Sequence, residues 1–344
     1  MSDSTRIWSP IDFAKDGKQV DFLRLPISTD TSAYGWIPVP AICVKNGVGP
    51  TAVLIAGTHG DEYEGQIGLM RLARGLRESD VSGRVIIFPS LNFPAVQAGR
   101  RVSPIDEGNL NRLYPGRAHG SATEMIAHYI THVILPMADL VVDLHSGGRS
   151  LDYLPCALVR GAKTTAENER LLELLRVFGV PLAEFTDGTG GGGNTTLPAA
   201  AGELGIPVIT AELGGGATLR RAGSDLAEHG ALRLLKHIGI LASFEAPDPE
   251  PVKMMSCESM DLFVYADSSG LFEPRVELGD QVKAGQLAGL LHSVDDPHRQ
   301  PREVLFPSSG LVVCKRHLTL ATRGDCLFGL LQDAATLPLG RTSC

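Results

Sequence analysis

Apolar and polar positions follow two different periods along the middle of the chain. Between about residues 50 and 245, short apolar runs with the length of buried strands alternate with longer stretches in which apolar residues recur every three or four positions. This alternation predicts an α/β fold in which helices cover a mainly parallel, mixed sheet. The predicted strands are residues 51–57, 84–90, 139–144 and 206–211, and the predicted helices are residues 65–76, 122–134, 164–178 and 224–241.

The two ends of the chain have a different pattern. Residues 1–47 mix short strand-like pieces with turn residues, and we interpret them as an N-terminal β element that packs on the main domain, residues 48–246. The proline-rich stretch 246–251 cannot continue a helix and marks a boundary. Residues 252–335 combine short strands with glycine turns and resemble an all-β sandwich of the biotinyl/lipoyl type. The hairpin at residues 293–301 contains no lysine, so we do not expect a swinging carrier arm.

Chemically reactive side chains follow three of the predicted strands. His59 and Glu62 lie on a glycine-flanked turn after the first strand, and His145 follows the third. Because ligands bind outside the carboxyl ends of parallel strands, we expect these side chains to converge on one crevice. Two histidines and one carboxylate suit zinc and leave the fourth tetrahedral position for water, which is typical of a catalytic site. Glu212, after the fourth strand, would then be the base that a hydrolytic metal site needs.

In this order, the four residues resemble the motifs of the succinylglutamate desuccinylase/aspartoacylase family, a branch of the zinc carboxypeptidase-like fold that cleaves N-acyl groups from amino acids. The resemblance covers about residues 50–240. It implies one zinc ion per chain, held by His59, Glu62 and His145. It also implies that Glu212 is the general base.

Residues 101–116 look like the substrate segment of the same family. The resemblance implies that Asn111 and Arg112 hold the substrate carboxylate and that Arg101 faces the scissile carbonyl oxygen. Arg112 could also be an ordinary surface ion-pair partner, but its place in the order of motifs favours the substrate role. Arg100 stands beside Arg101, and only one of the two can face the pocket.

The side chain of the substrate is suggested by a difference from other members of the family. In length and N-terminal extension, the chain is similar to the subgroup that deacetylates N-acetyl-2,4-diaminobutyrate in ectoine breakdown. Members that accept acidic side chains carry an arginine shortly before the base glutamate, where this chain reads Ala201-Gly-Glu203-Leu204. We therefore expect a cationic side chain with Glu203 as its partner, although Glu203 could equally be a solvated turn residue.

These observations together predict a zinc-dependent amidohydrolase that removes an acetyl group from the α-amino group of an amino acid. One alternative is a metallocarboxypeptidase, which would need an open cleft for a polypeptide. Another is a non-enzymatic zinc-binding or carrier module, against which Glu212 argues. The glycine-rich segment 187–196 predicts a lid or substrate-shaping loop. Such a lid would favour a small N-acyl amino acid over a peptide.

Charge and hydropathy restrict the partners. The formal net charge is −8, and the chain has no clustered basic footprint, so we expect no nucleic-acid partner. No uninterrupted apolar run reaches transmembrane length, and the N-terminus does not read as a signal peptide. We therefore expect a cytoplasmic protein without a membrane partner, with homo-oligomerisation left open. Its six cysteines show no paired spacing and are interpreted as reduced core thiols.

Three further residues could belong to a metal site. Asp143 precedes His145 by two positions, and we expect its side chain to point away from that of His145. It is either a buried structural acid or a group that orients a ligand histidine, and we favour the second. His128 and His132 are four residues apart on a predicted helix, but no glutamate follows His128, so we expect an exposed helix face.

Overall fold

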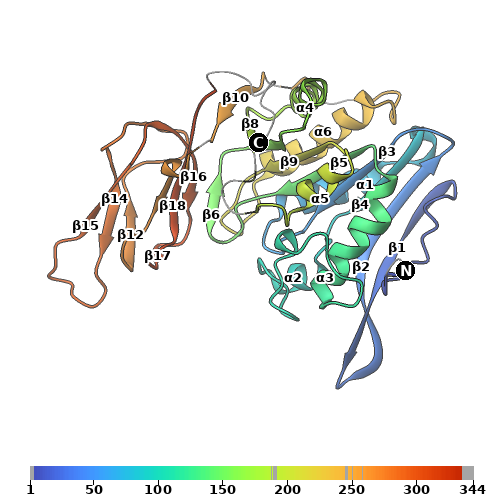
Figure 1. The fold of residues 1–344 in the computed structure, drawn as a ribbon, viewed down its shortest axis with the longest axis horizontal. Coiled ribbons are helices and arrows are strands. Elements are labelled where there is room, and N and C mark those ends of the chain that lie inside the picture. Colours follow the sequence, from blue (N-terminus) through green and yellow to red (C-terminus); the bar gives the residue numbers. More distant parts are fainter. Residues whose placement is uncertain are drawn as a thin grey trace.

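The computed structural model of the chain describes residues 4–186, 188, 192–244, 247–249, 251–257 and 259–334 (Figure 1). These residues contain one large mixed sheet and one small antiparallel sheet. In pairing order, the large sheet consists of β1 (Gly17–Thr29), β2 (Ser32–Asn46), β4 (Gly83–Phe88), β3 (Thr51–Ala56), β5 (Leu140–His145), β9 (Val208–Glu212), β7 (Cys156–Arg160), β8 (Leu182–Thr186), β10 (Lys253–Ser256), β18 (Cys326–Asp333), β16 (Gly310–Arg316) and β13 (Gln281–Val282), with β6 (Leu151–Tyr153) paired to β16 and β11 (Phe263–Tyr265) paired to β18.

The centre of the large sheet is parallel and apolar on both faces. β3 pairs in parallel with β4 and β5, and β5 pairs in parallel with β9. Every residue of β3 and β5 is buried, as expected for strands with helices on both sides. Leu54 packs into the core on one face, and Val53 and Ile55 pack into the core on the other, because successive side chains of a strand alternate. The predicted α/β fold with a mainly parallel sheet is confirmed.

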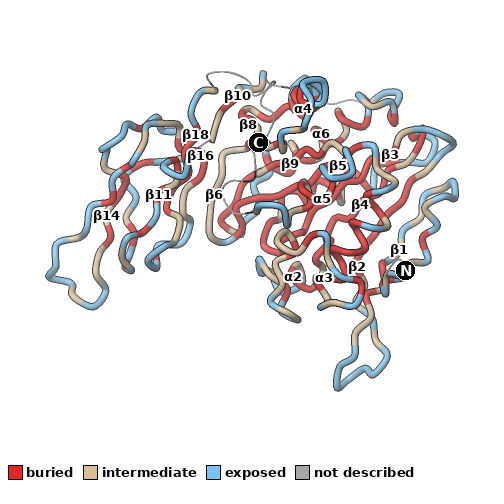
Figure 2. The backbone as a smooth tube through the Cα atoms, viewed as in Figure 1, coloured by how far each residue is buried: buried red, intermediate tan, exposed pale blue. Residues whose placement is uncertain are grey.

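Helices cover both faces of this sheet, and the buried segments follow its central strands (Figure 2). α1 (Glu64–Gly75), α4 (Thr165–Phe178) and α6 (Arg221–His237) supply the core on one face; α3 (Ala122–Tyr129) and α5 (Leu197–Glu203) supply it on the other. Among the described residues, no helix is long and apolar enough to cross a membrane. The remaining helical segments are α2 (Phe93–Ala98), the π-helix Ile130–Ile134, and the 3₁₀ turns Glu78–Asp80, Leu110–Arg112, Leu135–Met137 and Met260–Leu262.

All eight predicted elements occur, with shifted ends, and several more were missed. Both ends of α6 are shifted, since it spans Arg221–His237 rather than residues 224–241; Gly239, with a φ of +81°, follows its end. The missed elements include β7 and β8. These strands carry polar residues such as Glu184 and Arg160, so they do not read as continuous apolar runs. Their polar positions turn out to line the main cavity.

The terminal parts extend the sheet at its two ends (Figure 1). β1 and β2 form a long antiparallel hairpin, and β2 pairs antiparallel with β4. At the other end, β10 pairs in parallel with β8 and antiparallel with β18, so the sheet continues into the C-terminal strands. The predicted division into three domains stays a prediction.

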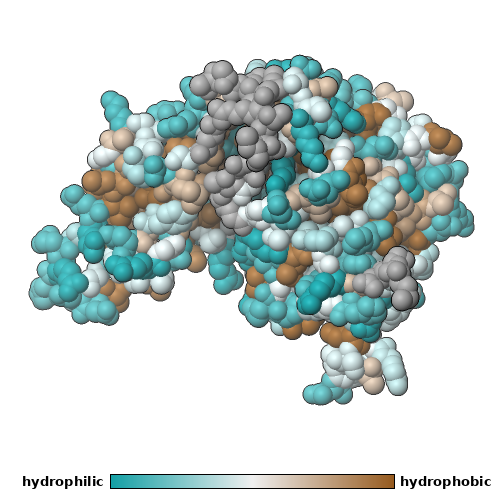
Figure 3. Space-filling view, in the orientation of Figure 1, coloured by the Kyte–Doolittle hydropathy of each residue, from teal (hydrophilic) through white to brown (hydrophobic). Residues whose placement is uncertain are grey.

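The small sheet contains β15 (Arg302–Leu305), β14 (Leu287–His292), β12 (Gly270–Pro274) and β17 (Leu320–Ala321). An apolar core joins it to the C-terminal strands of the large sheet, where the rings of Phe272 and Phe306 lie 5.7 and 5.3 Å from that of Phe328. The free end of this part is mostly hydrophilic in the space-filling view (Figure 3). Its likeness to a biotinyl/lipoyl sandwich stays a prediction.

Candidate active site

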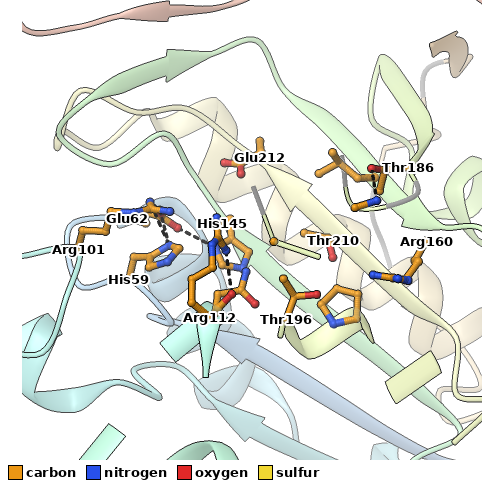
Figure 4. Close-up of a pocket in the computed structure, with 15 residues that line it drawn as sticks. His59, Glu62, Arg101, Arg112, His145, Arg160, Thr186, Thr196, Thr210 and Glu212 are labelled. Atoms are coloured by element: carbon orange, nitrogen blue, oxygen red, sulfur yellow. Dashed lines mark hydrogen bonds and ion pairs between the residues drawn. The ribbon is translucent and has the colours of Figure 1, made fainter. Parts of the chain in front are cut away.

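Three neighbouring parallel strands bring the reactive side chains together. His59 and Glu62 lie on the turn after β3, His145 is the last residue of β5, and Glu212 is the last residue of β9. His145 and Glu212 are paired in the register of β5 and β9. Since parallel strands end at one edge of a sheet, the predicted convergence follows directly from the topology. All four residues line one cavity (Figure 4).

His59, Glu62 and His145 form a compact, buried group. The two carboxylate oxygens of Glu62 lie 2.7 Å from His59 Nδ1 and 2.9 Å from His145 Nδ1. One ligand atom from each residue lies within 4.8 Å of the other two, and each side chain is only 3% exposed. The group therefore presents two imidazole nitrogens and a carboxylate to one point.

The outer nitrogens of both imidazoles are held by oxygen acceptors. His59 Nε2 lies 3.0 Å from Asn109 Oδ1, and His145 Nε2 lies 3.0 Å from Asp143 Oδ2. Each outer nitrogen can donate to its oxygen acceptor, which places Nδ1 of both rings toward Glu62. This is the arrangement by which proteins orient histidines that bind metals. The donor set fits a divalent cation such as zinc.

Charges in this group shift two pKa values in opposite directions. Burial alone would raise the pKa of Glu62, but His59 and His145 hold it far below its ordinary value. Burial alone would lower the pKa of His145, but Asp143 and Glu62 raise it well above its ordinary value. The group thus favours an anionic carboxylate with positive charge beside it.

Backbone and side-chain contacts hold the loops that carry these ligands. Glu64 accepts hydrogen bonds from Ser146 Oγ at 2.6 Å and from the backbone N–H of Arg220 at 3.0 Å, which ties together the segments after β3, β5 and β9. Gly57 has a φ of +69°, a conformation that favours glycine. At Gly60, a Cβ atom would lie 1.9 Å from the carbonyl oxygen of Ala95, so only glycine fits. These contacts and the two glycines fix the conformation of the loop that carries His59 and Glu62.

Glu212 faces the same cavity but has fewer contacts. Its Oε2 atom is buried and has no hydrogen-bond partner among the described residues. Burial and the negative charge of Glu62 raise the pKa of Glu212 to about 8. A carboxyl group in this state can hold or release a proton near neutral pH.

Arg101 and Arg112 are two of the arginines that line the cavity (Figure 4). Arg101 Nη1 lies 3.3 Å from Glu62 Oε1, so this arginine faces the pocket. Arg100 instead pairs with Glu107 at 2.7 Å on the surface, which resolves the choice between the two. Arg112 donates to the carbonyl oxygen of Asn111 at 2.8 Å, and both residues line the cavity.

The cavity has two adjoining parts. The first contains the groups described above, together with Thr196 and Thr210. The second has a volume of about 420 Å³ and extends between β7, β8 and the C-terminal strands. Five residues line both parts: Arg101, Arg112, Leu158, Thr186 and Glu212. The C-terminal strands contribute an apolar wall to the second part, made up of Phe263, Val313, Cys314, Gly329, Leu330 and Leu331.

Residues 48–238 match the family model of the succinylglutamate desuccinylase/aspartoacylase catalytic domain. The N-alpha-acetyl-L-2,4-diaminobutyric acid deacetylase of Halomonas elongata is 39% identical over 332 residues, which cover 96% of either chain. This chain belongs to the succinylglutamate desuccinylase/aspartoacylase family. The four residues that carried the resemblance in the sequence all lie inside the matched region.

Solved structures of the same family extend the likeness beyond the catalytic domain. The product-bound ectoine utilization protein EutE from Ruegeria pomeroyi superimposes with a TM-score of 0.91 at 37% identity, covering 96% of this chain and 99% of that chain. A succinylglutamate desuccinylase/aspartoacylase from Rhodobacter sphaeroides gives 0.90 at 36% identity, covering 96% and 100%. The family member described here therefore shares its terminal β parts with these relatives.

One predicted site residue does not join the others. Glu203 is the last residue of α5, is exposed, and lines a separate depression that also contains Lys163 and Arg170. Its position does not support contact with a substrate in the cavity. Of the predicted glycine-rich loop, Gly188 and Gly192 line the cavity, whereas residues 187 and 189–191 lie outside the described part of the chain.

The structure also corrects two expectations about neighbouring side chains. Asp143 points toward His145 rather than away from it, because residues two apart in a strand share a face. His128 is buried, so the expected exposed face is wrong for that residue, although His132 is exposed.

The sequence analysis missed Asn109, whose one signal was its place within the substrate segment. None of the five described cysteines is joined in a disulfide, and Cys344 lies outside the described residues.

Proposed function

We propose that this chain is a zinc-dependent hydrolase that converts N-α-acetyl-L-2,4-diaminobutyrate into 2,4-diaminobutyrate and acetate, as part of ectoine catabolism. The observation that carries the proposal is the placement of Glu212 beside the convergent donors His59, Glu62 and His145, with one oxygen that has no partner in the described part of the chain. The choice of substrate is supported by the likeness to the diaminobutyric acid deacetylase of Halomonas elongata and to the ectoine utilization protein EutE.

Each residue of the cavity has a role in this proposal. His59, Glu62 and His145 would hold one zinc ion, which when bound supplies Lewis-acid chemistry for amide hydrolysis. Glu212 accepts a proton from the attacking water and returns it to the leaving amine. Arg101 stabilises the negative charge that develops on the carbonyl oxygen.

The segment between the two histidines would hold the other end of the substrate. Arg112 and Asn111 bind the α-carboxylate, for which the planar guanidinium of arginine is geometrically suited. Burial and the neighbouring Arg101 lower the pKa of Arg112, and an anionic substrate would relieve the repulsion between the two cations.

The walls of the cavity favour a small substrate over a polypeptide. The C-terminal strands, which we also infer to form the biotinyl/lipoyl-like sandwich, bound the second part of the cavity with apolar residues such as Phe263 and Leu331. A metallocarboxypeptidase would need space there for the rest of the peptide. We therefore infer that the C-terminal part helps to exclude longer substrates.

Acetate release from a panel of N-acetyl amino acids tests the proposal. We expect the highest kcat/KM for N-α-acetyl-2,4-diaminobutyrate, a lower value for N-acetylaspartate, and loss of activity with a chelator that zinc restores. A short peptide should be cleaved poorly or not at all. The proposal fails if peptides are the better substrates, or if no N-acetyl amino acid is hydrolysed by the zinc-loaded protein.

A further inference from the structure

Glu184 is a buried acid that the proposed chemistry does not use. It lies in β8, is 9% exposed, and lines the second part of the cavity. Its Oε2 atom is buried and has no hydrogen-bond partner among the described residues. A buried carboxylate is costly unless it is paired with a cation or with hydrogen-bond donors. This cost suggests that a bound molecule, rather than a residue of the chain, supplies the partner of the Glu184 carboxylate.

The sheet register places Glu184 on the same face as Glu212. Cys156 of β7 is paired with Glu212 on one side and with Leu182 of β8 on the other. Glu184 follows Leu182 by two positions, and residues two apart share a face. With strands about 4.8 Å apart and a rise of about 3.3 Å per residue, the Cα atoms of Glu184 and Glu212 are roughly 12 Å apart. Two glutamate side chains can thus contact opposite ends of one small molecule.

Among the described residues, no cation forms an ion pair with the carboxylate of Glu184, although Arg101 and Arg112 also line this part of the cavity. Its direct neighbours in the sheet are Leu158 and Met255, which are apolar. The nearby cation Arg160 is engaged elsewhere, since it donates to the carbonyl oxygen of Gly193 at 2.8 Å and to Asn194 Oδ1 at 2.6 Å. Burial raises the pKa of Glu184 to about 7, as expected for an acid that lacks a positive partner.

We propose that Glu184 is the specificity-determining residue of this cavity and that its carboxylate binds the side-chain ammonium of the substrate. The proposal rests on the proposed function, because it assumes that the scissile amide lies between Glu212 and the metal ligands. A short cationic side chain would then extend along β7 into the second part of the cavity. This assigns to Glu184 the role that the sequence suggested for Glu203.

The test compares two substrates of equal length with the zinc-loaded, full-length protein. N-α-acetyl-2,4-diaminobutyrate carries an ammonium where N-α-acetylnorvaline carries a methyl group. A charge-assisted hydrogen bond to the ammonium predicts that Glu184→Gln lowers the ratio of the two kcat/KM values by roughly ten- to a hundredfold. Glu184→Asp keeps the charge and should retain part of the preference, which separates loss of charge from misfolding.

Glu203→Gln is the matched control, since it makes the same chemical change on an exposed side chain outside the cavity. Its substrate ratio should equal that of the wild type. A Glu184→Gln variant with an unchanged ratio, or a Glu184→Asp variant no better than Glu184→Gln, would overturn the assignment. If the proposed function itself were wrong, the result would differ, because the wild-type protein would then hydrolyse neither N-acetyl amino acid.

Discussion

The two ends of the cavity are built in opposite ways. At one end, both ring nitrogens of His59 and His145 are engaged, and both oxygens of Glu62 accept contacts. At the other end, Glu184 retains a buried oxygen without a partner among the described residues, and so does Glu212, which lines both parts of the cavity. Contacts within the chain specify the geometry of the first end. Both carboxyl groups line the cavity, and in the function proposed above their unpaired oxygens face the substrate.

The largest effect should come from removing a ligand at the fully contacted end. His59→Ala leaves two donors, which cannot hold zinc tightly, so both metal content and deacetylase activity should be lost. Metal analysis of protein purified without chelator measures the first, and acetate release measures the second. Full occupancy in this variant would contradict the ligand assignment.

Glu212→Gln tests the proposed general base without removing a metal ligand. The amide has nearly the same shape but cannot accept a proton, so kcat should fall at least ~100-fold, the low end for general acid–base catalysis. Zinc content should stay close to that of the wild type. Turnover near the wild-type value would show that the proton is taken by another group.

Glu184→Gln should also change stability, because an unpaired buried acid opposes folding once it ionises. The folded pKa of about 7 lies above the ordinary value of 4.5, so the folded state binds more protons between these values and its stability falls as the pH rises through this window. At pH 8 the variant should gain ~3 kcal/mol relative to the wild type, and at pH 4.5 almost nothing. Denaturant unfolding at both pH values measures the difference.

Other groups near Glu184 do not obscure this comparison. Burial raises the pKa values of Cys156 and Tyr153 well above their ordinary ranges, and a hydrogen bond with Cys326 together with burial does the same for Cys314, so these groups stay protonated throughout. Burial and Glu62, rather than Glu184, raise the pKa of Glu212 to about 8, so its contribution should be the same in both proteins. Parallel pH profiles for wild type and variant would show that Glu184 has a partner in solution.

A smaller effect is expected from the residues behind the metal ligands. Asp143→Asn keeps an oxygen near His145 Nε2 but removes the negative charge that strengthens the ligand, so zinc affinity should fall roughly ten- to a hundredfold. Competition with a chromophoric chelator gives the dissociation constant. An unchanged affinity would assign Asp143 a purely structural role.

Sequence alone determined the part of the site that follows from strand ends. His59, His145 and Glu212 each terminate or follow a short apolar run. The topology of a parallel sheet brings the ends of such strands together, independently of the conformation of the loops. The α/β class follows for the same reason, since the two hydrophobic periods are local properties of the chain. These predictions need no knowledge of which segments pack against each other.

Only the tertiary structure decided the rest of the cavity. Arg101 rather than Arg100 faces Glu62, and Glu184 rather than Glu203 lines the pocket. These choices depend on the orientation of irregular segments and on the pairing of β7 and β8 with strands distant in sequence. Near a cavity, polar residues replace the apolar ones that reveal a buried strand. The residue proposed to determine specificity, Glu184, therefore lies where the hydrophobic pattern is weakest.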